Sequence, residues 1–255
     1  MLGGAPVALG DVECRPRRVA VGVFDGVHLG HREVVRGSDC ALTFDPHPRA
    51  VLAPEHAPPL LTTVARRAEL LTALGVREVV VIPFDAAFAA RSATAFVEDV
   101  LVGALGATHV NVGASFRFGR GGAGDVDWLR RDERFATRVV PLVRVGERVV
   151  SSTAVRQLVA DGDVAGAAAL LGGPVTVDVR LGRGGELRPT VGCALPGPGV
   201  YDCRLRSAAG GVSAAVVHVG PGGELRPRRV GVAAGRPGES LRFGFVRRLA
   251  ADAAA

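Results

Sequence analysis

Short apolar runs rich in β-branched residues alternate with helical patterns from residue 18 to residue 171, and this alternation constrains the fold most. Such alternation is typical of a parallel sheet covered by helices. We therefore predict an α/β domain over residues 1–173. Its expected strands are Arg18–Val23, Ala41–Phe44, Glu78–Ile82, His109–Val112 and Arg138–Leu142, and its expected helices are Thr62–Leu74, Ala93–Leu105, Val126–Arg131, Thr153–Ala160 and Val164–Leu171.

The pattern changes at Gly172-Gly173-Pro174, where glycine and proline stop the helical periodicity. Short strand-like runs separated by Gly/Pro clusters follow. This spacing predicts a second domain over residues 174–255, a small antiparallel β-domain that we expect to be a barrel. Its expected strands are Val175–Leu181, Gly199–Leu205, Ser213–Val219 and Ser240–Leu249.

Composition excludes several classes of protein. Hydrophobic residues make up 48% of the 255 residues, which excludes global disorder. No apolar stretch reaches the ~20 residues of a membrane span, and residues 1–10 lack the pattern of a secretion signal. The four cysteines show no C-x-x-C spacing, so no zinc site is expected. We expect a cytoplasmic protein with reduced thiols and no membrane partner.

The formal net charge is +6, and every basic residue counted in it is an arginine, since the chain contains no lysine. A basic total raises the question of nucleic-acid binding. The arginines are scattered in doublets such as Arg17–Arg18 and Arg130–Arg131, without a basic tail or an aromatic-rich basic strand. A nucleic-acid face needs clustered basic residues, so we expect no nucleic-acid partner.

The sharpest motif follows the first expected strand. A glycine-bearing turn leads into His-x-Gly-His, where a helix is expected to begin near His31. Backbone N–H groups of such a turn and the positive end of a helix favour a polyphosphate. The two histidines are three residues apart, so both imidazoles can face one side of the first turn. The candidate residues are Gly22, Phe24, Asp25, Gly26, His28, Gly30 and His31.

A second motif, Val149–Arg156, places hydroxyl side chains at the start of a helix. Ser152 or Thr153 can cap that helix, and Arg156 lies about one turn further. Hydroxyls, free N–H groups and a guanidinium together suit a second phosphate site. Read separately, the two motifs are also compatible with an ordinary βα turn and a well-capped helix. Read together, they indicate transfer of a nucleotide, in which two groups of phosphates need neutralising.

The chain resembles the adenylyltransferase part of bacterial bifunctional riboflavin kinase/FAD synthetases over residues 17–173. Besides the two motifs, three stretches carry the resemblance: Thr43-Phe44-Asp45-Pro46-His47-Pro48, Phe116-Arg117-Phe118-Gly119 followed by Gly124-Asp125, and the helix from Asp161 to Gly172. The resemblance implies a Rossmann-like nucleotidyltransferase domain that transfers AMP from ATP to FMN, giving FAD and pyrophosphate.

The resemblance also implies roles for individual residues. His28 and His31 would contact the ATP phosphates and stabilise the transition state, while Ser152, Thr153 and Arg156 would hold the β- and γ-phosphates. Phe44, Pro46 and His47 would lie near the flavin phosphate, and Phe116, Phe118 and Asp125 near the flavin. Core packing is an equal alternative for Phe44, Phe116 and Phe118.

The implied chemistry needs no elaborate machinery. The FMN phosphate is ionised at neutral pH, so it attacks the α-phosphorus of ATP without a general base, and the enzyme positions reactants and screens charge. Mg²⁺ would bridge phosphates and keep much of its water, so no protein metal ligands are expected.

The sequence departs from the family in its nucleotidyltransferase half. The stretch from His31 to Cys40 is short, which predicts a truncated first crossover. Ser115 stands where the family has Asn or Asp, which predicts altered flavin recognition.

The second domain resembles an eroded riboflavin kinase barrel. Arg188-Pro189-Thr190-Val191-Gly192 resembles the family's Pro-Thr-Ala-Asn without its Asn, and Glu224 lies outside the context of the kinase's general base. We therefore expect riboflavin phosphorylation to be lost.

Two other functions remain open on the sequence alone. In the first, the chain is a paralogue that keeps the reaction class and uses another phosphorylated or phosphonate acceptor, with ATP or CTP. Alternatively, the chain binds flavin or nucleotide without catalysis, which the eroded barrel favours and the two intact motifs oppose.

Overall fold

The computed structural model describes residues 5–183, 186–190, 192–208, 210–230 and 237–250. Two compact units divide the chain. The sheet unit comprises Met1–Pro58 and Thr63–Arg144, and the barrel unit comprises Pro59–Thr62 and Val145–Ala255. The predicted domain boundary at residue 173 stays a prediction, and the contacts group residues 145–173 with the barrel.

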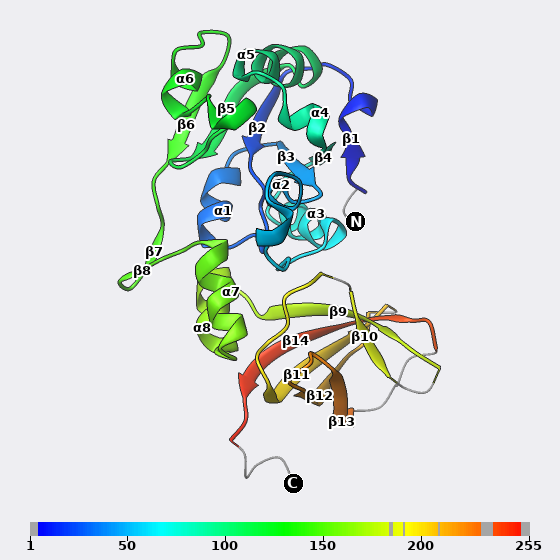
Figure 1. Ribbon diagram of the computed structural model, residues 1–255. Helices are drawn as coiled ribbons and strands as arrows, with labels where there is room; N and C mark the ends of the chain where they lie inside the picture. The colour runs from blue at the N-terminus through cyan, green and yellow to red at the C-terminus, as the bar shows by residue number, and fades with distance from the viewer. Residues whose placement is uncertain (1–4, 184–185, 191, 209, 231–236, 251–255) are drawn as a thin grey trace. The chain divides into compact units, whose positions relative to one another are not determined.

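The sheet unit contains a six-stranded sheet in which every neighbouring pair of strands is parallel (Figure 1). The strand order is β1-β4-β3-β2-β5-β6, so the predicted parallel α/β architecture is confirmed. The strands are β1 (Val7–Ala8), β2 (Arg17–Val21), β3 (Cys40–Asp45), β4 (Glu78–Pro83), β5 (Ala107–Gly113) and β6 (Ala136–Val140).

Residues on the two faces of this sheet enter two separate cores, because successive strand side chains point to opposite sides. Val19 and Val21 of β2 join a core that includes residues of η3, a π-helix over Phe96–Ala104. Ala20 joins a second core together with residues of α1 (Leu29–Val35) and α3 (Val64–Ala73). Burial on both faces explains why these strands read as continuous apolar runs.

Two predicted helices differ in detail from the structure. The helix expected over Thr62–Leu74 is α3, capped by Thr63, whose side chain accepts a hydrogen bond from the Arg66 N–H at 3.1 Å. The helix expected over Ala93–Leu105 splits into α5 (Ala93–Ala95) and η3. A Cβ at position 103 would lie 2.9 Å from the Glu98 carbonyl oxygen, so Gly103 permits the wider turns of η3.

Several short elements carry too few residues for a periodic signal, and sequence patterns did not predict them. They include β1, which extends the sheet beside β4, and α2, which follows β3. The remaining elements of the sheet unit are η1 (Leu9–Asp11), α2 (Pro48–Leu52), η2 (Pro54–His56), α4 (Ala86–Ala89), η4 (Arg120–Gly122), α6 (Val126–Arg130) and β7 (Arg144–Val145), whose last residue belongs to the barrel unit.

The barrel unit contains a closed barrel with the strand order β10-β13-β12-β11-β14-β9, all pairs antiparallel. This confirms the predicted β-barrel. Alternating buried and more exposed residues along β9 turn one set of side chains inward. The elements are β8 (Arg148–Val149), α7 (Ser152–Ala160), α8 (Val164–Leu171), β9 (Val175–Leu181), β10 (Leu187–Pro189), β11 (Gly199–Ser207), β12 (Val212–Val219), β13 (Leu225–Val230) and β14 (Ser240–Arg248).

Among the helices of the residues described above, none combines the length and apolarity that a bilayer crossing requires.

The cysteines differ in burial. Cys40 on β3 and Cys203 on β11 are buried, and desolvation is the main cause that raises the pKa of each to about 12. Cys14 is exposed. Because the folded state holds the Cys40 and Cys203 protons more tightly, this contribution to stability is present below about pH 9 and is lost as the pH rises toward 12.

We predict that iodoacetamide at pH 8.5 alkylates Cys14 of the native protein and leaves Cys40 and Cys203 unmodified, since the thiolate is the reacting form. Peptide mass spectrometry measures each site, and labelling in denaturant provides the control. Alkylation of Cys40 at the rate of Cys14 in the native protein would contradict this fold.

Candidate active site

Three candidate segments follow neighbouring strands of one parallel sheet. The glycine-bearing turn follows β2, the Asp45–His47 segment follows β3, and the Phe116–Phe118 loop follows β5. Parallel strands end at the same sheet edge, so all three segments lie there (Figure 1). The chain also reverses its order across the sheet between β2 and β5. Such a switch point is where open α/β sheets bind ligands.

The two histidines form one unit at the start of α1. The His28 Nδ1 accepts a hydrogen bond from the His31 N–H at 3.2 Å, so His28 caps the helix. The two rings are stacked, with centroids 3.6 Å apart and planes 14° apart. The prediction that both imidazoles face one side of the first turn is therefore confirmed. The helix begins at Leu29, two residues earlier than expected, and Gly30 lies within it.

The backbone of the preceding turn is held in an unusual conformation. Phe24 and Val27 have φ angles of 53° and 43°, in the left-handed region that non-glycine residues rarely adopt. Such residues cost about 1–3 kcal/mol each and persist where the surroundings fix them. Here the side chains of Phe24, Asp25 and Val27 are all buried. Gly26, at φ 84°, completes the turn.

Packing around this turn explains one glycine and orients one histidine. A Cβ at Gly22 would approach the Phe24 ring to 3.0 Å, so glycine lets that ring lie against the turn. The Phe24 ring in turn meets the His31 ring edge-on, with centroids 5.3 Å apart. The turn therefore orients the histidine pair through an aromatic contact.

The end of β3 carries a buried aromatic residue, and the segment that follows it ends in a helix cap. Phe44 is buried and contacts Phe84 and Phe88 edge-on or tilted, with centroids 5.8 and 6.1 Å away. The Asp45–Pro46 peptide bond is cis, and Pro46 is exposed. The His47 Nδ1 accepts a hydrogen bond from the Arg49 N–H at 3.1 Å and caps α2.

The loop after β5 combines one buried and one partly exposed ring. Phe118 is buried against Phe96 and Trp128, whereas Phe116 is partly exposed and stacks on Phe118 with centroids 5.6 Å apart. Core packing thus accounts for Phe118, and Phe116 offers the accessible ring. Phe84 and Phe88 extend the same aromatic cluster; sequence analysis missed them, although Phe84 follows the end of β4 directly.

Asp125 has a structural role in the same region. Its carboxylate accepts a hydrogen bond from the Trp128 N–H at 2.9 Å and caps α6. It also lies 3.5 Å from Arg117. The Trp128 N–H first, and then the charge of Arg117, hold the pKa of this carboxyl below its ordinary value.

In the motif Val149–Arg156 of the barrel unit, the residue that caps the helix is not one of the two predicted. Ser151, rather than Ser152 or Thr153, caps α7: its Oγ accepts a hydrogen bond from the Ala154 N–H at 3.1 Å. Ser152 and Thr153 instead occupy the first helical turn. The shift arises because the helix begins at Ser152, one residue before the expected start.

Arg156 lies on α7 and is partly buried. Its Nε donates a hydrogen bond to the Pro59 carbonyl at 2.8 Å, which ties residues 59–62 to the barrel unit. The same segment is held by the Leu60 N–H, which donates to the Gly192 carbonyl at 2.8 Å. The two predicted phosphate clusters therefore belong to different compact units, and their convergence on one triphosphate stays a proposal.

Side-chain hydrogen bonds stabilise the short crossover between His31 and Cys40 that the sequence predicts. α1 has only seven residues, and β3 still lies parallel to β2. Arg138 Nη1 donates to the carbonyls of Glu33 and Arg36 at 3.2 and 3.1 Å, which satisfies the end of the helix. The Asn111 side chain donates to Ser38 Oγ at 3.0 Å.

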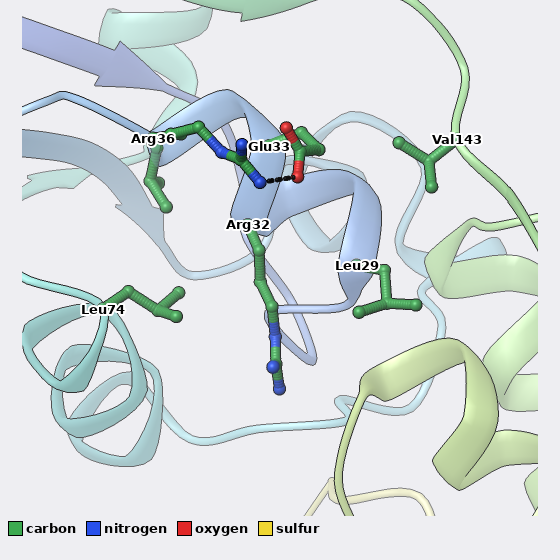
Figure 2. A pocket seen from close by; sticks show the side chains of 7 residues that line it. Leu29, Arg32, Glu33, Arg36, Leu74 and Val143 are labelled. Atoms are coloured by element: carbon green, nitrogen blue, oxygen red, sulfur yellow. Dashed lines mark hydrogen bonds and ion pairs between the residues drawn. The ribbon is translucent and has the colours of Figure 1, made fainter.

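A groove of about 430 Å³ lies beside this short helix. Figure 2 shows Arg32 extending into it, while Glu33 and Arg36 form an ion pair at its rim. Its lining includes Leu29, next to His28, but neither His28 nor His31. Its lining residues are Leu29, Arg32, Glu33, Val35, Arg36, Leu74 and Val143.

Within the parts of the chain that the structure describes, histidine, cysteine and acidic side chains do not gather in groups of three or more that could hold a metal.

The fold defines an α/β protein with a parallel sheet, a histidine-bearing turn at the switch point of that sheet, and a closed barrel in the same chain. The sequence matches the family described as FAD synthetase over residues 12–154. The chain belongs to this FAD synthetase family.

Its relatives include the bifunctional riboflavin kinase/FMN adenylyltransferases of Escherichia coli K12 and Listeria monocytogenes. The chain is 35% and 34% identical to them over 187 residues, which is 68% of this chain and 60% and 59% of the relatives. The chain thus spans about three-fifths of their length. A Geobacillus thermodenitrificans relative is 38% identical over 62% of this chain and 90% of that protein.

A solved structure described as a macrolide-efflux protein from Streptococcus pneumoniae has a TM-score of 0.82 and 23% identity. The match covers 96% of this chain and 90% of that chain. At this identity the likeness concerns the fold alone.

The corrected cap of α7 gives a testable prediction. Ser151→Ala should lower the free energy of unfolding of the barrel unit by about 1 kcal/mol, because an N-terminal N–H loses its acceptor. Thr153→Ala, at an exposed position of the same turn, should change it by less than about 0.5 kcal/mol. Denaturant titration compares the two variants. A larger loss in Thr153→Ala than in Ser151→Ala would contradict the assignment.

Proposed function

We propose that this protein is an FMN adenylyltransferase, which transfers AMP from ATP to FMN and releases FAD and pyrophosphate. The observation that carries the proposal is the stacked His28/His31 pair, fixed by a strained turn at the switch point of the sheet. The family match includes this turn, and two relatives of the chain bear the same activity in their names.

In the proposed reaction a phosphate oxygen of FMN attacks the α-phosphorus of ATP. A new P–O bond forms, the bond between the α-phosphorus and its bridging oxygen breaks, and pyrophosphate leaves with the bonding electrons. No proton is removed, because the FMN phosphate is already ionised. Catalysis therefore consists of positioning and charge neutralisation. Mg²⁺ enters bound to the ATP phosphates, which agrees with its preference for few protein ligands.

Each half of the substrate has a proposed set of contacts. The backbone of Gly22, Gly26 and Gly30 and the imidazoles of His28 and His31 serve the ATP phosphates, with Phe24 and Asp25 shaping the turn. Ser152, Thr153 and Arg156 serve the β- and γ-phosphates. On the acceptor side we assign Phe44, Pro46 and His47 to the FMN phosphate region and Phe116, Phe118 and Asp125 to the flavin pocket wall.

We further propose that the barrel no longer phosphorylates riboflavin. The Thr190 N–H and hydroxyl both donate to the Asp178 carbonyl, at 3.0 and 3.2 Å, so this threonine is engaged by its own barrel. Val191, which stands within the degenerate motif, lies outside the described residues. The large side chains Tyr201, Phe243 and Phe245 are fully buried in the barrel.

The proposed partners are small molecules, ATP and FMN, rather than nucleic acid or membrane, and the proposed location is the cytoplasm. The arginines are scattered along the chain, which supports small molecules rather than nucleic acid as partners. Because the same chemistry suits other phosphorylated acceptors, the choice of FMN needs a direct test.

We predict that the purified protein converts FMN and MgATP into FAD and does not convert riboflavin and MgATP into FMN. Separation of the three flavins by chromatography with fluorescence detection measures both steps. FMN produced from riboflavin would contradict the loss of the kinase. If the protein used another phosphorylated acceptor and formed no FAD, that compound would replace FMN as the proposed acceptor.

Two substitutions test the assigned residues. His28→Asn keeps a good helix cap and removes the imidazole, and it should lower kcat/KM about 10²–10³-fold. Arg156→Ala should raise the KM for ATP and lower kcat/KM. His56→Ala and Arg148→Ala, both at exposed positions, are the matched controls and should retain activity. Unchanged kinetics in both site variants would refute the proposed site.

A further inference from the structure

A buried arginine contacts the end of β3, at the edge of the sheet where the candidate active site lies. Arg67, on α3, has only 1% of its side chain exposed. Taking a guanidinium out of water is costly unless its hydrogen bonds and charge are compensated. The identity of its partners therefore indicates what the residue does.

The hydrogen-bond partners of Arg67 belong to the strand that leads to the acceptor-side segment. Its Nη1 donates to Thr43 Oγ1 at 3.0 Å and to the Phe44 carbonyl at 3.1 Å. The Thr43 hydroxyl in turn donates to the Val23 carbonyl at 2.9 Å. A hydroxyl that accepts from one side and donates to the other has a single favourable orientation. A continuous path thus joins α3, the end of β3 and the turn after β2.

The charge partners of Arg67 lie in the same two segments. Burial lowers the pKa of the Arg67 guanidinium, and the carboxylates of Asp25 and Asp45 act in the opposite direction. Asp25 is itself buried in the strained turn. An arginine remains protonated at any physiological pH, so a fixed positive charge faces both segments.

If the partners of Arg67 served only to compensate its buried charge, they would not need to lie in two segments that meet at the candidate active site. Resting on the function proposed above, we propose that Arg67 and Thr43 are positioning residues that fix the histidine-bearing turn relative to the Phe44–His47 segment. The attacking phosphate and the phosphates of ATP would then be aligned for in-line transfer by one buried hydrogen-bond path. Neither residue touches substrate in this account.

Arginine suits this role better than lysine. Both acceptors bind Nη1, whose two N–H groups are held in the plane of the guanidinium, whereas a lysine ammonium is a freely rotating point charge without that fixed plane. Arg67→Lys should keep the charge opposite Asp25 and lose part of the geometry. Thr43→Val, nearly equal in shape, should keep the packing and cut the path at the hydroxyl, while Thr43→Ser should preserve it.

The test compares these variants in steady-state formation of FAD from FMN and MgATP. Thr43→Val should lower kcat about tenfold to a hundredfold, because small misplacements of reacting groups are costly. The KM values for ATP and FMN should change less than about threefold, since ground-state contacts remain. Thr43→Ser should restore most of kcat, and Arg67→Lys should be intermediate. Arg66→Lys, at a side chain paired with Glu69 outside the path, is the control.

A second readout separates this proposal from the proposed function. Amide and imidazole NMR shifts of residues 24–31 should change in Thr43→Val and return in Thr43→Ser, whether or not the wild type forms FAD. Failure of the wild type to form FAD overturns the adenylyltransferase assignment alone. Wild-type kcat in Thr43→Val, or unchanged shifts in the turn, overturns the positioning role.

Discussion

The structure depends on the parallel pairing of β2 between β3 and β5. Val21 lies opposite Leu42 of β3, and Ala20 lies opposite Asn111 of β5. This register brings the turn after β2 beside the segments that follow the other two strands. Both faces of β2 are buried, so a slip of one residue would exchange Ala20 with its valine neighbours between the two cores and spoil the packing of both. The candidate active site is thus a consequence of strand order, because residues far apart in the chain meet only at this edge.

Two buried arginines secure the two ends of this sheet in different ways. Arg17, 1% exposed, donates from its Nε to Glu78 at 2.7 Å and from Nη1 to the Leu105 carbonyl at 3.0 Å. Its hydrogen bond holds the pKa of the Glu78 carboxyl below the ordinary value. Both residues are at the amino ends of their strands, away from the ligand edge, which suits a purely structural role. Arg67 contacts the opposite end, where the same kind of burial serves the site.

Sequence patterns predicted the larger features because these depend on periodicity and turn residues. The five main strands of the sheet, the barrel and the histidine pair were all predicted, although limits shifted by a few residues. Arg67 was missed because a lone arginine on a helix gives no pattern that distinguishes a buried side chain from an exposed one. The cap at Ser151 was misplaced because three adjacent hydroxyl residues satisfy the same preference. The crossover closed by Arg138 depends on a contact between residues that no local pattern links.

The proposed activity depends most on the stacked His28/His31 pair at the start of α1, which we propose binds the phosphates of ATP. A crystal structure of the protein with a non-hydrolysable ATP analogue tests this most directly. We expect the imidazoles of His28 and His31 to contact the phosphates of the bound analogue. A bound triphosphate that lies away from both imidazoles would contradict the proposed site.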